Sequence, residues 1–293
     1  MQEAKGLYDP EFERDSCGFG LIANLDDMPS HWVVETAISA LARLTHRGAV
    51  AADGKTGDGC GLLLKFPTSF MRAAGEELGL ELGARFAAGT VFLCQDDTRA
   101  LGARDVIVSA ITEVGLEAAG WRVVPTDPSV CGDEAVRTLP RIEQVFVNAP
   151  DGMPRGRFNR RLFLARRKAE KQLGEGDTYV SSLSSATISY KGMIMPGALP
   201  GFYPDLKDPR LETSVCVFHQ RFSTNTLPQW RLAQPFRFLA HNGEINTISG
   251  NRNWAQARAR NFISDKLDDI SDLDPIISLT GSDSSSLDNM LEV

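Results

Sequence analysis

Short apolar segments typical of β-strands occur toward both ends of this chain, and longer helical segments occupy much of the sequence between them. Strands are predicted at residues 17–25, 60–66, 88–93, 121–124, 144–147 and 214–222, with two more within 179–190. After Ser30, apolar side chains recur at three- and four-residue spacing from Val34 to Leu44, which predicts an amphipathic helix. Further helices are predicted at residues 68–78, 100–115, 157–173 and 247–260. This order indicates an α+β protein in which two layers of sheet are covered by helices.

Two segments rich in glycine or proline, 46–59 and 195–211, are predicted to be loops. No internal repeat or low-complexity tract divides the 293 residues, so residues 195–211 are interpreted as a loop and not as a linker between domains. At the end of the sequence, Asp283 and Ser284 can start a helix whose apolar face is cut short at Val293. Because so short a helix is marginal on its own, we expect a fragment of a longer protein, truncated at its C-terminal end.

Composition excludes several classes of function. The net charge is −7, and the clustered basic residues at 160–161 and 166–168 fall on a predicted helix, where they indicate a solvated face and not a nucleic-acid site. No apolar run approaches the ~18 residues needed to span a bilayer, so no membrane partner is expected. The five cysteines form no C-x-x-C motif, which argues against disulfides or an iron–sulfur cluster and favours the cytoplasm. The four histidines lack helical i, i+4 spacing, so no metal site is predicted.

Cys17 lies where an acidic leader, residues 1–16, meets the first predicted strand. The leader has no apolar core segment and no basic start, so it is not a secretory signal. If the leader is removed, Cys17 becomes the first residue, and its thiol and its own α-amine lie together. An α-amine has a pKa of about 7.7–8.0, which suits proton transfer near neutral pH. The alternative is a small buried residue at the start of a strand.

Three further motifs supply the groups needed to release ammonia from a carboxamide. Arg221, where a strand meets a polar loop, can bind a carboxylate through two parallel hydrogen bonds, or else pair with a structural acid. Asn242 and Gly243 offer a side-chain amide and a backbone N–H that can form an oxyanion hole, or else a plain hairpin or loop turn. Asp283 can accept hydrogen bonds from an ammonium group, or else serve as a helix N-cap.

A rival pair of chemical groups lies in and beside the glycine-rich segment 46–59. Cys60 and His46 are a second possible nucleophile and base, although nothing in the sequence orients them toward each other. The glycines also suggest a phosphate-binding loop, but the Walker pattern is absent and no helix follows directly. We therefore interpret the segment as a loop beside a pocket and not as a nucleotide site.

Taken together and in this order, the motifs resemble those of the class II, or N-terminal-nucleophile, glutamine amidotransferases. The resemblance is closer still to the amidotransferase domain of the glutamate synthase large subunit. It extends from about Tyr8 to the end of the chain and rests on the stretches CGFGLIA, LTHRGA with ADGKTGDGCGLLL, LPRIEQVFVNAP, FHQRFSTNT with QPFRFLAHNGEINTI, and TGSDSSSLDNMLE.

The resemblance implies a four-layer αββα sandwich of the N-terminal-nucleophile hydrolase type. It implies that residues 1–16 are a removed leader and that residues 17–293 form the amidotransferase domain. In family terms Cys17 is nucleophile and base, and Asn242 with the Gly243 N–H forms the oxyanion hole. Arg221 then holds the α-carboxylate of glutamine and Asp283 its α-ammonium group.

Family members of this type continue well beyond 293 residues. The resemblance implies later regions with an FMN-binding barrel, an iron–sulfur cluster and a site that aminates 2-oxoglutarate, none of which this chain can supply. The expected partners are glutamine, the remaining synthase domains of the same polypeptide and a small electron-transfer subunit. The alternatives are a separate amidotransferase subunit that serves another synthase, and a non-catalytic glutamine-sensing or assembly module.

Overall fold

The computed structural model describes residues 18–223, 226–267 and 270–293. Their strands form two four-stranded antiparallel sheets, with strand orders β1-β8-β2-β7 and β4-β5-β3-β6. The first sheet contains β1 (Phe19–Ala23), β2 (Thr56–Lys65), β7 (Thr187–Ile194) and β8 (Val215–Gln220). The second contains β3 (Phe86–Leu93), β4 (Glu117–Val123), β5 (Arg141–Asn148) and β6 (Tyr179–Val180). The prediction of two sheets is confirmed.

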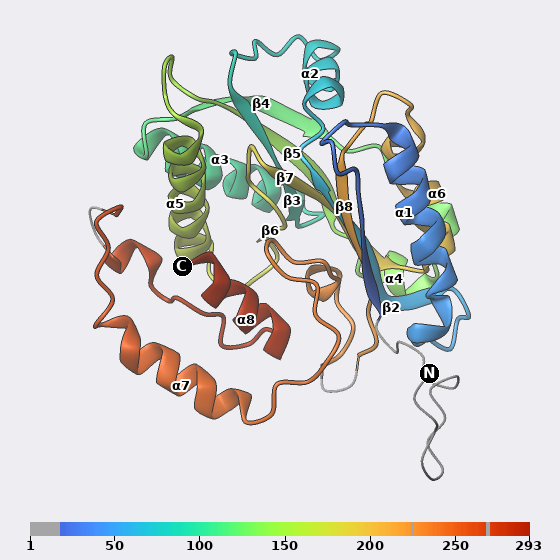
Figure 1. The fold of residues 1–293 in the computed structure, drawn as a ribbon. Helices are drawn as coiled ribbons and strands as arrows, with labels where there is room; N and C mark the ends of the chain where they lie inside the picture. The colour runs from blue at the N-terminus through green and yellow to red at the C-terminus, as the bar shows by residue number, and fades with distance from the viewer. Residues whose placement is uncertain (1–17, 224–225, 268–269) are drawn as a thin grey trace, which may run out of the picture.

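Helices cover both sheets. Helix α1 (His31–Arg43) packs on β1 and β8, whereas α3 (Asp97–Glu113) and α5 (Arg155–Leu173) pack against each other beside the second sheet. Figure 1 shows α1 on the right of the molecule, α3 and α5 on the left, and strands between them. The remaining α-helices are α2 (Thr68–Glu76), α4 (Asp133–Arg137), α6 (Leu199–Phe202), α7 (Ile248–Ala259) and α8 (Asp283–Glu292).

Alternating side chains along β3 and β5 divide the core into two clusters. Even-numbered residues such as Phe92 and Phe146 join a large cluster that also holds the buried face of α1 and the even-numbered residues of β2. Odd-numbered residues such as Val91 and Val145 pack with α3 and α5 in a second cluster. Since side chains alternate between the faces of a strand, both faces of the second sheet are buried.

Two loop predictions are wrong in part. Residues 56–59 open strand β2, which runs irregularly between Thr56 and Cys60 because Gly59 adopts a φ of +126°. Residues 195–211 contain 3₁₀ helices at Pro196–Ala198 and Pro204–Lys207 and the short helix α6. Proline fits the first turn of a helix, where its missing N–H is not needed, so a proline-rich segment can form short helices.

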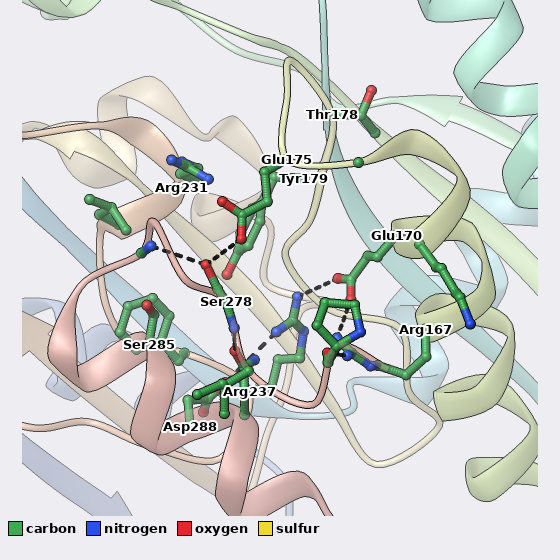
Figure 2. A pocket seen from close by; sticks show the side chains of 18 residues that line it. Arg167, Glu170, Glu175, Thr178, Tyr179, Arg231, Arg237, Ser278, Ser285 and Asp288 are labelled. Carbon is green, nitrogen blue, oxygen red and sulfur yellow. Dashed lines mark hydrogen bonds and ion pairs between the residues drawn. The ribbon is translucent and has the colours of Figure 1, made fainter. Parts of the chain in front are cut away.

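The basic residues 166–168 of α5 do not form a solvated face, which corrects this part of the prediction, whereas Arg160 is exposed as predicted. Arg166 is only 2% exposed and bonds to Glu170 on its own helix and to Glu292 at the end of α8, at 2.6 Å in each case. Arg167 donates to the backbone oxygen of Leu273, and Arg237 also reaches Glu170, at 3.0 Å. Figure 2 shows Arg167, Glu170, Arg237 and Asp288 around a cavity of about 250 Å³ beside α5 and α8. These ion pairs fix the C-terminal segment to the body of the molecule.

Across the described part of the chain, no helix combines the length and the apolar character that crossing a lipid bilayer requires.

Candidate active site

One polar cavity of about 490 Å³ collects four of the five predicted site residues. Arg221, Asn242, Gly243 and Asp283 all line it, although they come from three separate parts of the sequence. The fifth, Cys17, lies outside the described residues, as does the whole leader, residues 1–16. The cavity is formed by the end of β8, the segment 241–248 and the start of α8.

Gly18 fixes where the chain leaves the first sheet toward Cys17. Its backbone oxygen accepts a hydrogen bond from the Gln220 N–H at 2.5 Å. A Cβ atom at Gly18 would lie 3.0 Å from Oδ1 of Asn242, so Gly18 is packed against that side chain. Gly18 therefore ties the start of β1 to the segment that carries Asn242.

Arg221 is 6% exposed and directly follows β8. Its backbone N–H donates to Gly59, and its guanidinium donates to the Asp58 carbonyl at 3.3 Å and to Thr226 Oγ1 at 2.7 Å. Burial lowers the pKa of the guanidinium, and the charges of Asp58 and Asp283 oppose this effect. Arginine nevertheless remains charged in proteins, so Arg221 places a fixed cation in the cavity wall.

Asn242 and Gly243 lie in a loop and not in a β-hairpin. No strand forms in the described residues after Gln220, so the hairpin alternative is excluded. The loop is instead attached to α8, because Oδ2 of Asp283 accepts a hydrogen bond from the Ile245 N–H at 2.7 Å. The two amide groups of the predicted oxyanion hole therefore lie on a segment that belongs to no sheet and is hydrogen-bonded to α8.

Asp283 is the first residue of α8, and the N-cap is Ser282, whose Oγ accepts from the Ser285 N–H at 3.1 Å. The alternative prediction that Asp283 is the helix N-cap is therefore wrong, because the N-cap is the preceding residue, Ser282. Its Oδ1 accepts from the Ser284 N–H at 2.7 Å, and its charge acts on Arg221. A carboxylate and a guanidinium in one cavity match the two charged groups of a free amino acid.

His219 belongs to the cavity although the sequence analysis assigned it no role. It is 1% exposed, and its Nε2 lies 3.1 Å from the His241 carbonyl oxygen. Donation from Nε2 leaves Nδ1 as an acceptor, and Nδ1 has no partner among the described residues. Burial lowers the pKa of the imidazole to about 4, so it is neutral near pH 7. The sequence does carry a signal for His219: it lies two residues before Arg221, and side chains at this spacing along a strand point to the same face.

The rival pair of Cys60 and His46 is not assembled for catalysis. Cys60 is fully buried, its thiol donates to the Ile194 carbonyl at 3.1 Å, and burial raises its pKa far above the ordinary value. His46 lies on the 3₁₀ helix Thr45–Arg47 with its Nδ1 3.0 Å from the Arg43 oxygen. Because the thiolate is the reactive form, Cys60 is a structural residue.

The sequence of residues 17–293 matches the family model described as "Glutamine amidotransferases class-II". The chain belongs to this family.

Its relatives include two bacterial proteins named "Glutamate synthase [NADPH] large chain". The one from Bacillus subtilis is 40% identical across 100% of this chain and 20% of its own length, and that from Azospirillum brasilense is 44% identical across 98% and 19%. The "Glutamate synthase [NADH]" of Saccharomyces cerevisiae is 39% identical across 100% and 14%. The chain therefore spans a fifth or less of the length of these relatives.

Proposed function

We propose that this chain hydrolyses the side-chain amide of glutamine to glutamate and ammonia. The observation that carries the proposal is the single cavity in which Arg221, Asn242, Gly243 and Asp283 meet, next to the residue that follows Cys17. Family membership supports the same reaction. The cavity holds candidates for the oxyanion donors and for the two groups that bind the amino-acid end of the substrate.

The reaction begins after removal of residues 1–16. The Cys17 sulfur attacks the amide carbon, and the freed α-amine takes the thiol proton and passes it to the departing nitrogen, which leaves as ammonia. The Asn242 side-chain amide and the Gly243 N–H donate to the oxygen that becomes negative in the tetrahedral intermediate. Water, activated by the same amine, then breaks the thioester bond and releases glutamate with the thiol restored.

The substrate is held by its amino-acid end. Arg221 binds the α-carboxylate, and Asp283 accepts hydrogen bonds from the α-ammonium group. Support comes from the burial of Arg221 and from the influence of the Asp283 charge on it. Because Arg221 and Asp283 line the same cavity, they favour a zwitterionic amino acid over an amide without these charged groups.

The fold proposed for this chemistry is the four-layer αββα sandwich of N-terminal-nucleophile hydrolases. Two antiparallel sheets, with α1 beside one and α3 and α5 beside the other, are consistent with it. We further propose that residues 17–293 form the amidotransferase domain and that the protein works in the cytoplasm.

The ammonia would serve a second site in a longer polypeptide. The printed names of the relatives, and the small share of their length that this chain covers, support a glutamate synthase that aminates 2-oxoglutarate. In the described residues no group of three His, Cys, Asp or Glu side chains could hold a metal ion, so this part does not fit an iron–sulfur cluster. We propose that FMN and the cluster belong to the other domains, and that a small electron-transfer subunit is a further partner.

The test is made on the complete gene product. Mass spectrometry should find Cys17 as the first residue, and Cys17→Ala should abolish glutamine hydrolysis, because no other thiol carries the reaction. Cys94→Ala, which alters a partly exposed thiol outside the cavity lining, should leave the rate unchanged. Full activity in Cys17→Ala would overturn the proposal, and a retained leader on an inactive protein would favour a sensing module.

A further inference from the structure

The peptide group of His241, which immediately precedes the predicted oxyanion hole, is held by the side chain of Gln234. The Gln234 Nε2 donates to the His241 carbonyl oxygen at 3.1 Å, and the His241 N–H donates to the Gln234 Oε1 at 2.9 Å. One side-chain amide thus makes the pair of hydrogen bonds that a neighbouring β-strand would make. We refer to this pair of bonds as the Gln234 clamp.

The clamp is buried and reinforced. Gln234 is 5% exposed, so water does not compete well for its amide. The His241 carbonyl also accepts from the His219 Nε2 at 3.1 Å, on strand β8 of the first sheet. Two buried donors therefore converge on one carbonyl oxygen, and both belong to residues that line the 490 Å³ cavity.

The segment 241–248 has no sheet to define its position, because no strand forms in the described residues after Gln220. Its placement depends on side-chain contacts: the Gln234 clamp at the His241 peptide, the His241 Nδ1 at 2.9 Å from the Ser284 Oγ, and the Asp283 carboxylate at 2.7 Å from the Ile245 N–H. Asn242 and Gly243 lie between these two attachments. Donors to an oxyanion are effective only when they are held in place before the charge develops.

We propose that Gln234 is a positioning residue for the oxyanion hole. It orients Asn242 and the Gly243 N–H through the His241 peptide and does not itself touch the substrate. The inference rests on the proposed glutamine hydrolysis. A glutamine is required because the clamp needs one donor and one acceptor at the end of the same side chain. Glutamate offers only acceptors, and methionine offers neither group at a similar size.

The test compares Gln234→Met and Gln234→Glu with Gln144→Met in the complete gene product. Gln144 is 0% exposed, bonds to Arg122 at 2.9 Å and lies on β5 away from the cavity, so it is a matched buried control. Removing an oxyanion donor costs ~10²–10³-fold in kcat, and misplacing one should cost about tenfold or more. The Gln234 variants should lose this much kcat while KM for glutamine stays within about threefold, because the oxyanion forms only in the transition state.

A second readout separates positioning from general damage. Alkylation of Cys17 by iodoacetamide forms a carbon–sulfur bond and expels iodide without forming an oxyanion. Its rate should be the same in wild type and in the Gln234 variants. The nearly isosteric Gln234→Glu provides the comparison if Gln234→Met does not fold.

The outcomes are distinct. If the wild-type protein hydrolyses glutamine and the Gln234 variants keep its kcat, the clamp has no positioning role. The inference is equally overturned if Gln144→Met loses as much kcat, or if iodoacetamide labelling falls in step with hydrolysis. Absence of hydrolysis in the wild-type protein would instead contradict the proposed function.

Discussion

Arg221 combines burial with a bonding pattern that leaves its charge facing the cavity. Its guanidinium donates hydrogen bonds to a backbone carbonyl and to a hydroxyl, Thr226 Oγ1, and the charges of Asp58 and Asp283 act on it from nearby. A carboxylate that enters the cavity can supply the full opposite charge.

Arg221→Lys should therefore raise KM for glutamine by roughly 10- to 100-fold, since a lysine cannot make two parallel bonds and a charge-assisted hydrogen bond contributes about 1.5–3 kcal/mol. Steady-state kinetics measure the effect. Arg231→Lys, on the 3₁₀ helix Trp230–Leu232 outside this cavity, is the control and should keep the wild-type KM. Equal KM values in both variants would remove Arg221 from the binding site.

The lowered pKa of His219 predicts that the stability of the fold depends on pH. Burial lowers its pKa from an ordinary value of 6.5 to about 4, and the charges of Arg221 and His241 act in the same direction. Between these two values the unfolded chain binds a proton that the folded protein does not, so the folded state loses stability as the pH falls from about 6.5 to about 4.

Denaturant unfolding of wild type and His219→Gln at several pH values tests this. Glutamine can still donate to the His241 carbonyl but does not titrate. The difference in unfolding free energy between the two proteins should be constant above pH 7 and should shift against the wild type on acidification. If the unfolding free energies of the two proteins change in parallel down to pH 4.5, His219 is not the source of the pH dependence.

Among the elements, α8 depends on a buried set of charges at its C-terminal end. Arg166 of α5 and Glu292 of α8 are 2% and 4% exposed and lie 2.6 Å apart. Glu170 shares the same arginine: burial would raise its pKa, but Arg166 and Arg237 outweigh burial and lower it. Removing one member of such a group leaves the others as unpaired buried charges.

Arg166→Met should therefore destabilise the fold by about 3–5 kcal/mol. The comparison is Arg210→Met, which breaks exposed pairs with Glu77 and Asp208 and should cost less than about 1 kcal/mol. Chemical denaturation measures both. A loss of less than about 1 kcal/mol in Arg166→Met would mean that α8 is held mainly by apolar contacts.

Periodicity predicted most elements because it depends on neighbours in the sequence. The helices at 157–173 and 247–260 are confirmed as α5 and α7 with ends shifted by one or two residues. The predicted strand at 60–66 starts four residues later than β2. A Cβ at Gly59 would lie 2.9 Å from Ala233, so a glycine is needed there, and glycines in this segment resemble a loop in sequence. The prediction of a solvated face at residues 166–168 fails because two of their acidic partners, Asp272 and Glu292, lie more than a hundred residues away in the sequence.

In the molecule as a whole, the candidate site joins the end of β8, the segment 241–248 and the start of α8. The sequence supplied the chemistry of Arg221, Asn242 and Asp283 one motif at a time, and only the family resemblance predicted that they act together. Gln234 escaped prediction because it contacts a backbone group that no sequence pattern marks, whereas the period-two spacing of His219 and Arg221 was a usable signal for His219. The residues proposed to act on the substrate were recognisable from their chemical type, whereas the Gln234 contact with the His241 peptide was visible only in three dimensions.

The hydrogen bond between Asp283 and the Ile245 N–H links the two roles proposed above, recognition of the amino group by α8 and placement of the amide donors on the segment 241–248. A sliding motion of α8 along its axis would carry the recognition of the amino group and the placement of the amide donors in the same direction. Affinity and turnover would then change together, and evolution could adjust one without the other only by remodelling the contact itself.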